Sequence, residues 1–147
     1  MSATRQTDYV ILPSLTKESA NFQPTTLIIS GWPPGLTNDS AVDILRILGF
    51  GCCFNLLYVL HDLRTYQSLN AFLVNVSDAD NVPKFIATFA ALPGIVVAFA
   101  NCQGLQAATD IFVTHAPADF PIEAWPRLYD FNGAMRPVKP GRTPAFF

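Results

Sequence analysis

The side chains of this sequence that could take part in catalysis are few and stand apart. Histidine occurs twice, as His61 and His115, and the three cysteines include the adjacent pair Cys52 and Cys53. A catalytic site needs a nucleophile beside a base, a pair of carboxylates, or a set of metal ligands at suitable spacing. His61 and Asp62 are neighbours, but neighbouring side chains on a strand point to opposite sides. The sequence therefore predicts no enzyme, no metal site and no cofactor.

Composition and hydropathy favour one folded, intracellular chain. Half of the 147 residues are apolar and 14% are charged, which is typical of a compact domain rather than a disordered segment. No apolar run approaches the roughly 20 residues that span a bilayer, and the N-terminal sequence is too polar for a secretory signal. An odd number of cysteines, two of them adjacent, is typical of free thiols in a reducing compartment. We expect an intracellular protein without membrane contact, in either the nucleus or the cytoplasm.

Apolar runs and helical stripes alternate along the middle of the chain. Runs of apolar and β-branched residues predict four strands, over 25–32, 54–63, 69–78 and 94–102. Two helices between them are predicted from apolar side chains at steps of three and four, namely Ala41, Ile44, Leu45 and Leu48, then Val82, Phe85, Ile86 and Phe89. Thr37 suits the N-cap of the first helix. A third, shorter helix is predicted over 105–115, so the order is βαββαβ followed by a helix.

This order predicts an α+β fold of the ferredoxin-like, split βαβ type. In that fold two helices pack on one face of a four-stranded antiparallel sheet, and the other face stays open. We expect three regions: a leader or edge segment at 1–24, the βαββαβ domain with its added C-terminal helix at 25–115, and a tail at 116–147. The six prolines of the tail exclude long regular elements, although its aromatic residues are too numerous for an inert linker.

Two segments of the chain resemble one known family. The run GFGCCFNLLYVLHDLRTYQSLNAFLVNVSDADNVPKF at 49–85 resembles, without a gap, the strand and loop pattern of the Mei-two-like C-terminal RNA recognition motif (RRM). The run FANCQGLQAATDIF at 99–112 is similar to the last strand and the extra helix of the same family. The resemblance covers about 25–115. It implies an RRM sandwich with an added C-terminal helix, which binds single-stranded RNA without metal or cofactor.

The family register assigns candidate RNA contacts to the open sheet face. An RRM stacks unpaired bases on aromatic rings of this face and holds phosphates with flanking basic groups. By alternation along the strands, the face carries Ile28, Ser30, Leu56, Tyr58, Ala71, Leu73, Asn75, Val96 and Ala98, with Arg64 in a neighbouring loop. Phe72, Val74 and Val76 should point into the core. Tyr58 is the best surviving ring, and it is equally well explained as a tyrosine packed on the sheet.

The usual RNA-contacting residues, the RNP motifs, are degenerate. Asn70 and Ala71 stand where a typical motif has glycine and an aromatic residue, and the next stacking position is Leu73. Each lost base stack removes ~1–3 kcal/mol of binding free energy. Over 25–115 there are three Lys or Arg against six Asp, and the whole chain has a net charge of −2. We therefore expect weak or altered binding of single-stranded RNA.

The apolar character of the same face favours a second function. An apolar patch of this kind is seldom left in contact with water. Either the tail folds back across it through Phe120, Trp125, Tyr129 and Phe131, or a protein partner covers it. The alternative prediction is thus a protein–protein interaction module that uses the sheet face. From Arg136 onward the tail is purely basic, which is common both in phosphate-binding and in unstructured segments.

Overall fold

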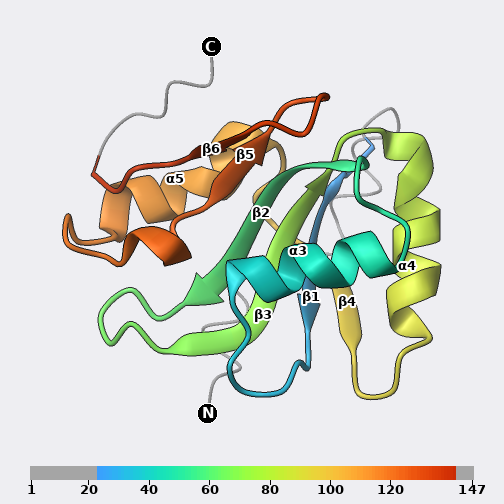
Figure 1. Cartoon of the computed structure of the whole chain (residues 1–147), viewed down its shortest axis with the longest axis horizontal. Coiled ribbons are helices and arrows are strands. Elements are labelled where there is room, and N and C mark those ends of the chain that lie inside the picture. Colours follow the sequence, from blue (N-terminus) through green and yellow to red (C-terminus); the bar gives the residue numbers. More distant parts are fainter. Residues whose placement is uncertain (1–22, 142–147) are drawn as a thin grey trace.

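The computed structural model describes residues 23–141, and the predicted leader at 1–24 lies outside this range except for its last two residues. In chain order the elements are β1 (Thr26–Ser30), α3 (Asn38–Ile47), β2 (Phe54–His61), β3 (Ser68–Val76), the 3-10 turn η1 (Ala79–Asn81), α4 (Val82–Ala90), β4 (Val96–Phe99), α5 (Leu105–His115), the 3-10 turn η2 (Ile122–Ala124), β5 (Arg127–Tyr129) and β6 (Met135–Pro137) (Figure 1). Within 23–141, no helix has both the length and the apolar character needed to cross a membrane.

One antiparallel sheet runs through the molecule in the order β4-β1-β3-β2-β5-β6. Its first four strands, with α3 and α4 between them in sequence, are compatible with the split βαβ arrangement. The sheet has six strands where four were predicted, because β5 and β6 extend it beyond β2. Both added strands are three residues long. Pro137 lies on the edge strand β6, where proline is tolerated because no further strand needs its missing N–H.

The first core lies between the sheet and the helices α3 and α4. Thr37 caps α3 as predicted, and its side chain accepts a hydrogen bond from the amide of Ser40 at 3.1 Å. Large apolar side chains of α3 and α4 pack on Leu27, Ile29 and alternate residues of β2 and β3. Phe50 and Phe85 stack with ring centroids 4.0 Å apart. Phe72, Val74 and Val76 belong to this core, as predicted. The fully buried side chains of the core are Leu27, Ile29, Leu45, Leu57, Val59, Phe72, Val74, Phe85 and Phe89.

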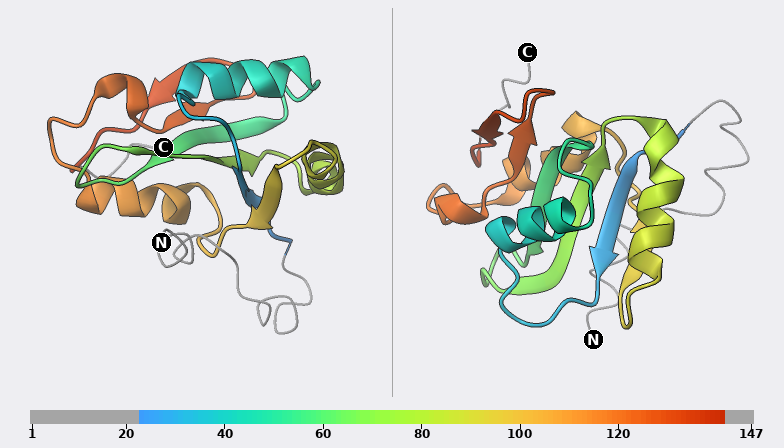
Figure 2. Two further views of the ribbon diagram at one scale, coloured as in Figure 1. Left: turned by 90° about the horizontal axis from the view of Figure 1, so that it is seen from below. Right: turned by 45° about the vertical axis from the view of Figure 1, so that its right-hand side comes forward.

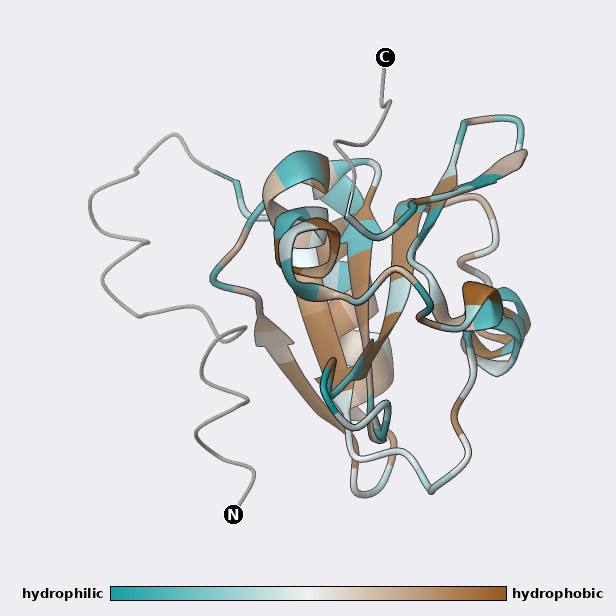
Figure 3. Cartoon of the chain, turned by 90° about the vertical axis from the view of Figure 1, so that its left-hand side faces the viewer, coloured by the Kyte–Doolittle hydropathy of each residue, from teal (hydrophilic) through white to brown (hydrophobic). Residues whose placement is uncertain are grey.

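A second core lies on the opposite face of the sheet. There α5 and the segment after it cover β1, β3 and β2, so that the sheet is enclosed between α3 and α5 (Figure 2, left). The central strands are strongly apolar, whereas the β5–β6 hairpin is mostly hydrophilic (Figure 3). The face that the βαββαβ pattern leaves open is therefore occupied, across most of its width, by the chain's own C-terminal part.

Candidate nucleic-acid interface

The predicted contact residues do share one face of the sheet. Ile28 pairs with Leu73 on one side and with Ala98 on the other, and Leu73 in turn pairs with Tyr58. Paired residues of neighbouring strands point to the same face. The same register joins Ser30 to Ala71 and Val96, and Asn75 to Leu56. The predicted assignment of side chains to the two faces is confirmed by these pairings and by the membership of the two cores.

The centre of this face is buried beneath α5. Tyr58, Leu56 and Leu73 have no exposed surface. The ring of Tyr58 meets the ring of Phe112 edge to face, with centroids 5.5 Å apart, and Phe112 meets Phe120 in the same way at 5.4 Å. Edge-to-face pairs of this kind add about 0.5–1.5 kcal/mol to the burial of the rings. Tyr58 is thus a packing residue in this conformation, and no base can reach it while α5 is in place.

Ile28 and Ala71 are also buried in the second core, whereas four other predicted contacts lie at the margin of the covered area. Ser30 and Ala98 are partly buried, and Val96 on the edge strand β4 is 59% exposed. Arg64 is exposed in the loop between β2 and β3, where its backbone amide donates to the carboxylate of Asp62 at 3.0 Å. These four positions are open to a ligand, but none of them carries an aromatic ring.

Gln103 anchors the start of α5 to the first strand. Its side-chain oxygen accepts hydrogen bonds from the backbone amides of Thr25 and Thr26, at 2.9 and 2.8 Å. Its side-chain nitrogen donates to the carbonyl oxygens of Thr26 and Ala100, at 2.9 and 2.7 Å. One amide side chain therefore satisfies four backbone groups, and this fixes where the chain turns from β4 into α5.

Asn75 continues the same polar cluster across the sheet. Its side-chain oxygen accepts a hydrogen bond from the hydroxyl of Thr26 at 2.7 Å, and its amide nitrogen donates to Asn55 at 2.9 Å. The hydroxyl of Thr26 also accepts from the amide of Gly104 at 2.9 Å. Asn75 is 6% exposed. Asn75, which was predicted as an RNA contact, is thus engaged with Thr26 and Asn55 instead.

The loop between β2 and β3 contacts the segment that follows α5. The hydroxyl of Tyr66 donates to the carboxylate of Asp119 at 2.8 Å, and this hydrogen bond raises the pKa of Tyr66 above its usual value. The rings of both Tyr66 and His61 pack edge to face on Phe120. Burial lowers the pKa of His61, although its hydrogen bond with the carbonyl of Val59 acts in the opposite direction. These contacts hold the segment that follows α5 against one end of the sheet, and Gln103 lies at the opposite end.

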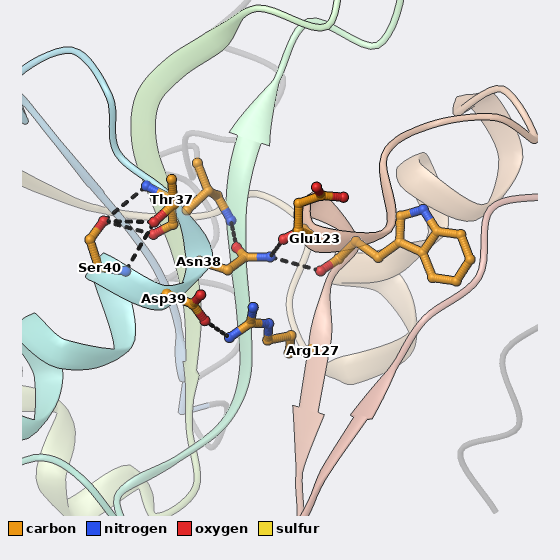
Figure 4. A network of polar contacts seen from close by, with 8 residues as sticks. Thr37, Asn38, Asp39, Ser40, Glu123 and Arg127 are labelled. Atoms are coloured by element: carbon orange, nitrogen blue, oxygen red, sulfur yellow. Dashed lines mark hydrogen bonds and ion pairs between the residues drawn. The ribbon is translucent and has the colours of Figure 1, made fainter.

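Asn38, at the start of α3, joins the C-terminal segment to the central fold (Figure 4). Its amide nitrogen donates to the carbonyl oxygens of Glu123 and Trp125 at 3.0 and 2.9 Å, and its oxygen accepts from the amide of Val59 at 3.0 Å. The side chain is 2% exposed, so these three hydrogen bonds are shielded from water. This role could not be predicted from the sequence, because Asn38 has the pattern of an ordinary residue in the first turn of a helix.

The four tail aromatics that were expected to cover the face have different positions. Phe120 is buried in the second core, and Trp125 packs against it while donating its indole N–H to the Phe120 carbonyl at 2.8 Å. Tyr129 packs instead on Phe54 at the first core, and Phe131 is 93% exposed. Alternation along β5 explains the difference, since Leu128 takes the α5 side of the sheet and its neighbour Tyr129 takes the other.

An open groove remains on the α5 side of the sheet, where the added strands extend beyond the cover. It has a volume of about 580 Å³. Its lining residues come from the ends of β2 and β3, the start of α5 and the β5–β6 hairpin: Asn55, Ser77, Leu105, Leu128, Tyr129, Asp130, Phe131, Ala134, Met135 and Arg136. No sequence pattern predicted this groove, although the aromatic and basic residues of the tail were a signal for it.

No protein-family model matches the chain, and no curated protein matches it in sequence. The resemblance to the Mei-two-like RRM therefore stays a prediction from the residues. Among residues 23–141, no three His, Cys, Asp or Glu side chains are grouped closely enough to hold a metal ion.

Proposed function

We propose that this chain is an RNA recognition motif of the Mei-two-like type that binds single-stranded RNA weakly, through an altered surface. The observation that carries the proposal is the strand order β4-β1-β3-β2, with α3 and α4 on one face and the added helix α5 after β4. The residues over 25–115 that resemble the family predict that arrangement. Fold alone does not determine function, so the binding surface has to be argued from its own residues.

Binding by the usual mode would require α5 to leave the sheet. Tyr58 is the one aromatic ring on the predicted contact face, and Phe112 and Phe120 close over it. Without two or three base stacks of ~1–3 kcal/mol each, affinity falls by several orders of magnitude relative to a typical RRM. The covered sheet face therefore supports the part of the proposal that binding is weak and uses the surface that remains open.

A titration with labelled single-stranded RNA of random sequence tests the proposal. Fluorescence anisotropy at low and at physiological salt should give saturable binding that weakens as salt rises, with a dissociation constant in the range of about 10⁻⁴–10⁻⁶ M at physiological salt. Duplex RNA of the same length is the control. The proposal fails if no binding is seen at low salt, or if duplex and single strand bind equally well.

Two variants locate the contact within that titration. Tyr58→Phe keeps the buried ring and should leave RNA binding unchanged, because the residue lies under α5. Arg64→Ala removes the one predicted cation of the β2–β3 loop, and a loss of affinity would place RNA along that end of the sheet. If both variants bind RNA as the wild type does, the groove at the β5–β6 hairpin is the next candidate for the RNA contact.

A protein-interaction module on the same fold is the second candidate function. The observation that favours it is the apolar packing of the second core, where the face is used to bind protein side chains, here those of α5 and the segment after it. Absence of RNA binding at low salt would favour this candidate. Salt-dependent binding that a point substitution on the surface abolishes would exclude it as the main role.

A further inference from the structure

The open groove begins where a row of paired residues emerges from beneath α5. Thr26 pairs with Asn75, Asn75 with Leu56, Leu56 with Leu128, and Leu128 with Arg136. All five therefore point to the α5 side of the sheet. The first four are buried, and Arg136 on the edge strand is exposed. The two added strands thus extend this face of the sheet beyond α5. There Arg136, the last residue of the row, is exposed and can contact a ligand.

An exposed aromatic ring lines the same groove as this cation. Phe131, in the turn between β5 and β6, keeps 93% of its surface in water although it lines the groove. Met135, also in the lining, is 48% exposed. A ring with an open face and a neighbouring guanidinium is the pair of groups with which proteins hold unpaired nucleotides, the base on the ring and the phosphate on the cation.

Hydrogen-bonding groups line the opposite side of the groove. Asn55 lies at an irregularity in the pairing of β2 with β3, and Ser77 follows the last residue of β3. Asn55 is partly exposed and Ser77 is exposed. An amide and a hydroxyl are suited to the polar edge of a base or to a ribose hydroxyl. A volume of about 580 Å³ lies within the usual range of about 300–1,000 Å³ for small-ligand sites.

We infer that this groove is a binding site for one unpaired nucleotide of single-stranded RNA, with the base on Phe131 and the phosphate at Arg136. The inference rests on the proposed RNA-binding function and gives it a surface away from the covered sheet face. Charge favours such an occupant over a basic or neutral peptide segment, since residues 131–141 carry Arg136 and Lys139 and no acidic residue. The exposed ring of Phe131 favours a base over an acidic side chain, which has no aromatic face to stack on it.

The single acidic side chain of the groove is already engaged. The carboxylate of Asp130 accepts hydrogen bonds from the amides of Asn132 and Ala134, both at 2.9 Å, and so closes the hairpin turn. Its charge nevertheless offsets that of Arg136, so binding should depend more on stacking than on phosphate attraction. One phosphate contact predicts a shallow salt dependence, with a slope of about −0.7 in log K against log salt.

The test is an anisotropy titration of the full chain with labelled single-stranded RNA of random sequence. Phe131→Ala should weaken binding roughly 5- to 100-fold, and Phe131→Trp should retain it, because the π face is kept. Arg136→Gln should weaken binding several-fold and flatten the salt slope by about 0.7. Ile122→Ala, at an apolar side chain that is 63% exposed outside the groove, is the matched control for Phe131. Arg46→Gln, at an exposed arginine on α3, is the matched control for Arg136.

The outcomes separate this inference from the proposed function. Loss of binding by Phe131→Ala and Arg136→Gln with both controls unaffected supports the groove. Wild-type binding that none of the groove variants changes overturns the groove and leaves RNA binding standing. No binding by the wild-type chain at low salt overturns both. Circular dichroism should show every variant folded, since Phe131 and Arg136 are exposed.

Discussion

Both faces of the sheet are packed, but the segments that cover them come from different parts of the sequence. The first face is covered by α3 and α4, which lie between the strands in sequence, and its core contains stacked phenylalanine rings from both sides. The second face is covered by α5 and the segment after it, and its margin is held by polar side chains such as Gln103 and Asn38. The sheet face that the βαββαβ order leaves free is therefore one side of a second core.

This difference teaches how a sheet of the βαββαβ order can have its free face buried without a change in the order of its first four strands. The buried side chains of the first core all come from the βαββαβ elements and the loops between them, and from the described chain after β4 only Tyr129 packs against them. The second core is added by later residues, and it uses the face on which an RRM displays aromatic rings. Leu73 and Ala71, which the predicted family register assigns to stacking positions, are buried under α5 and suit burial better than contact with water.

The largest effect should come from the first core. Phe85 is fully buried and stacks on Phe50 at 4.0 Å. Phe85→Ala should lower the free energy of unfolding by about 4 kcal/mol, because it removes a large ring and leaves a cavity among rigid neighbours. Urea denaturation followed by circular dichroism measures the change. A loss below about 1 kcal/mol would mean that α4 is not packed as described.

A somewhat smaller and more local effect is expected in the second core. Phe112→Ala removes the ring that covers Tyr58 and should cost about 3 kcal/mol. Because α5 lies at the end of the domain, the loss should appear first as faster hydrogen exchange in α5 and in 120–138, while β1 and β3 stay protected. Equal loss of protection in both cores would show that the two faces form one cooperative unit.

The polar anchor of α5 should contribute less than either ring. Gln103→Ala leaves the amides of Thr25 and Thr26 without their side-chain acceptor, which should cost about 1–3 kcal/mol. Gln103→Glu retains the acceptor and removes the two donated hydrogen bonds, so it separates the two halves of the interaction. Thermal unfolding of the three proteins at neutral pH provides the comparison. Wild-type stability in both variants would contradict the anchor.

The smallest expected effect is a dependence of stability on pH at His61. Burial lowers the pKa of this residue in the folded chain below its ordinary value of 6.5. The unfolded chain therefore binds the proton more readily, so stability is complete above pH 6.5 and decreases as the pH falls through 6.5 toward the folded pKa. His61→Gln should remove that part of the pH dependence in urea titrations at pH 5–8, and an unchanged pH profile would contradict the burial of the ring.

Much of the fold followed from local patterns. The stripe from Ala41 to Leu48, the cap at Thr37 and the alternation of Phe72, Val74 and Val76 each determine the structure of their own segment, and each is confirmed. The division of side chains between the two faces followed from the same alternation. Such features can be predicted because the physical cause lies within a few residues of the effect.

Features that depend on distant partners could not be predicted in this way. Leu128 and Arg136 belong to strands of three residues, which carry too little pattern to be recognised beside Pro126 and Pro137. Asn38 acts through backbone groups of Glu123 and Trp125, and nothing near Asn38 in sequence indicates those partners. The candidate groove depends on β5 and β6, because they extend the sheet that forms its floor. Its position is set by the place where α5 no longer covers the sheet.

The burial of isoleucine methyl groups tests the closed second face most directly. In a chain with labelled isoleucine methyls, a soluble paramagnetic agent should broaden the signals of Ile47 and Ile122, which are 81% and 63% exposed. Ile29, in the first core, is fully buried and serves as the protected reference. With α5 on the sheet, Ile28 should be as well protected as Ile29. Broadening of Ile28 to the level of Ile47, with Ile29 unaffected, would show that the face is open and would contradict the second core.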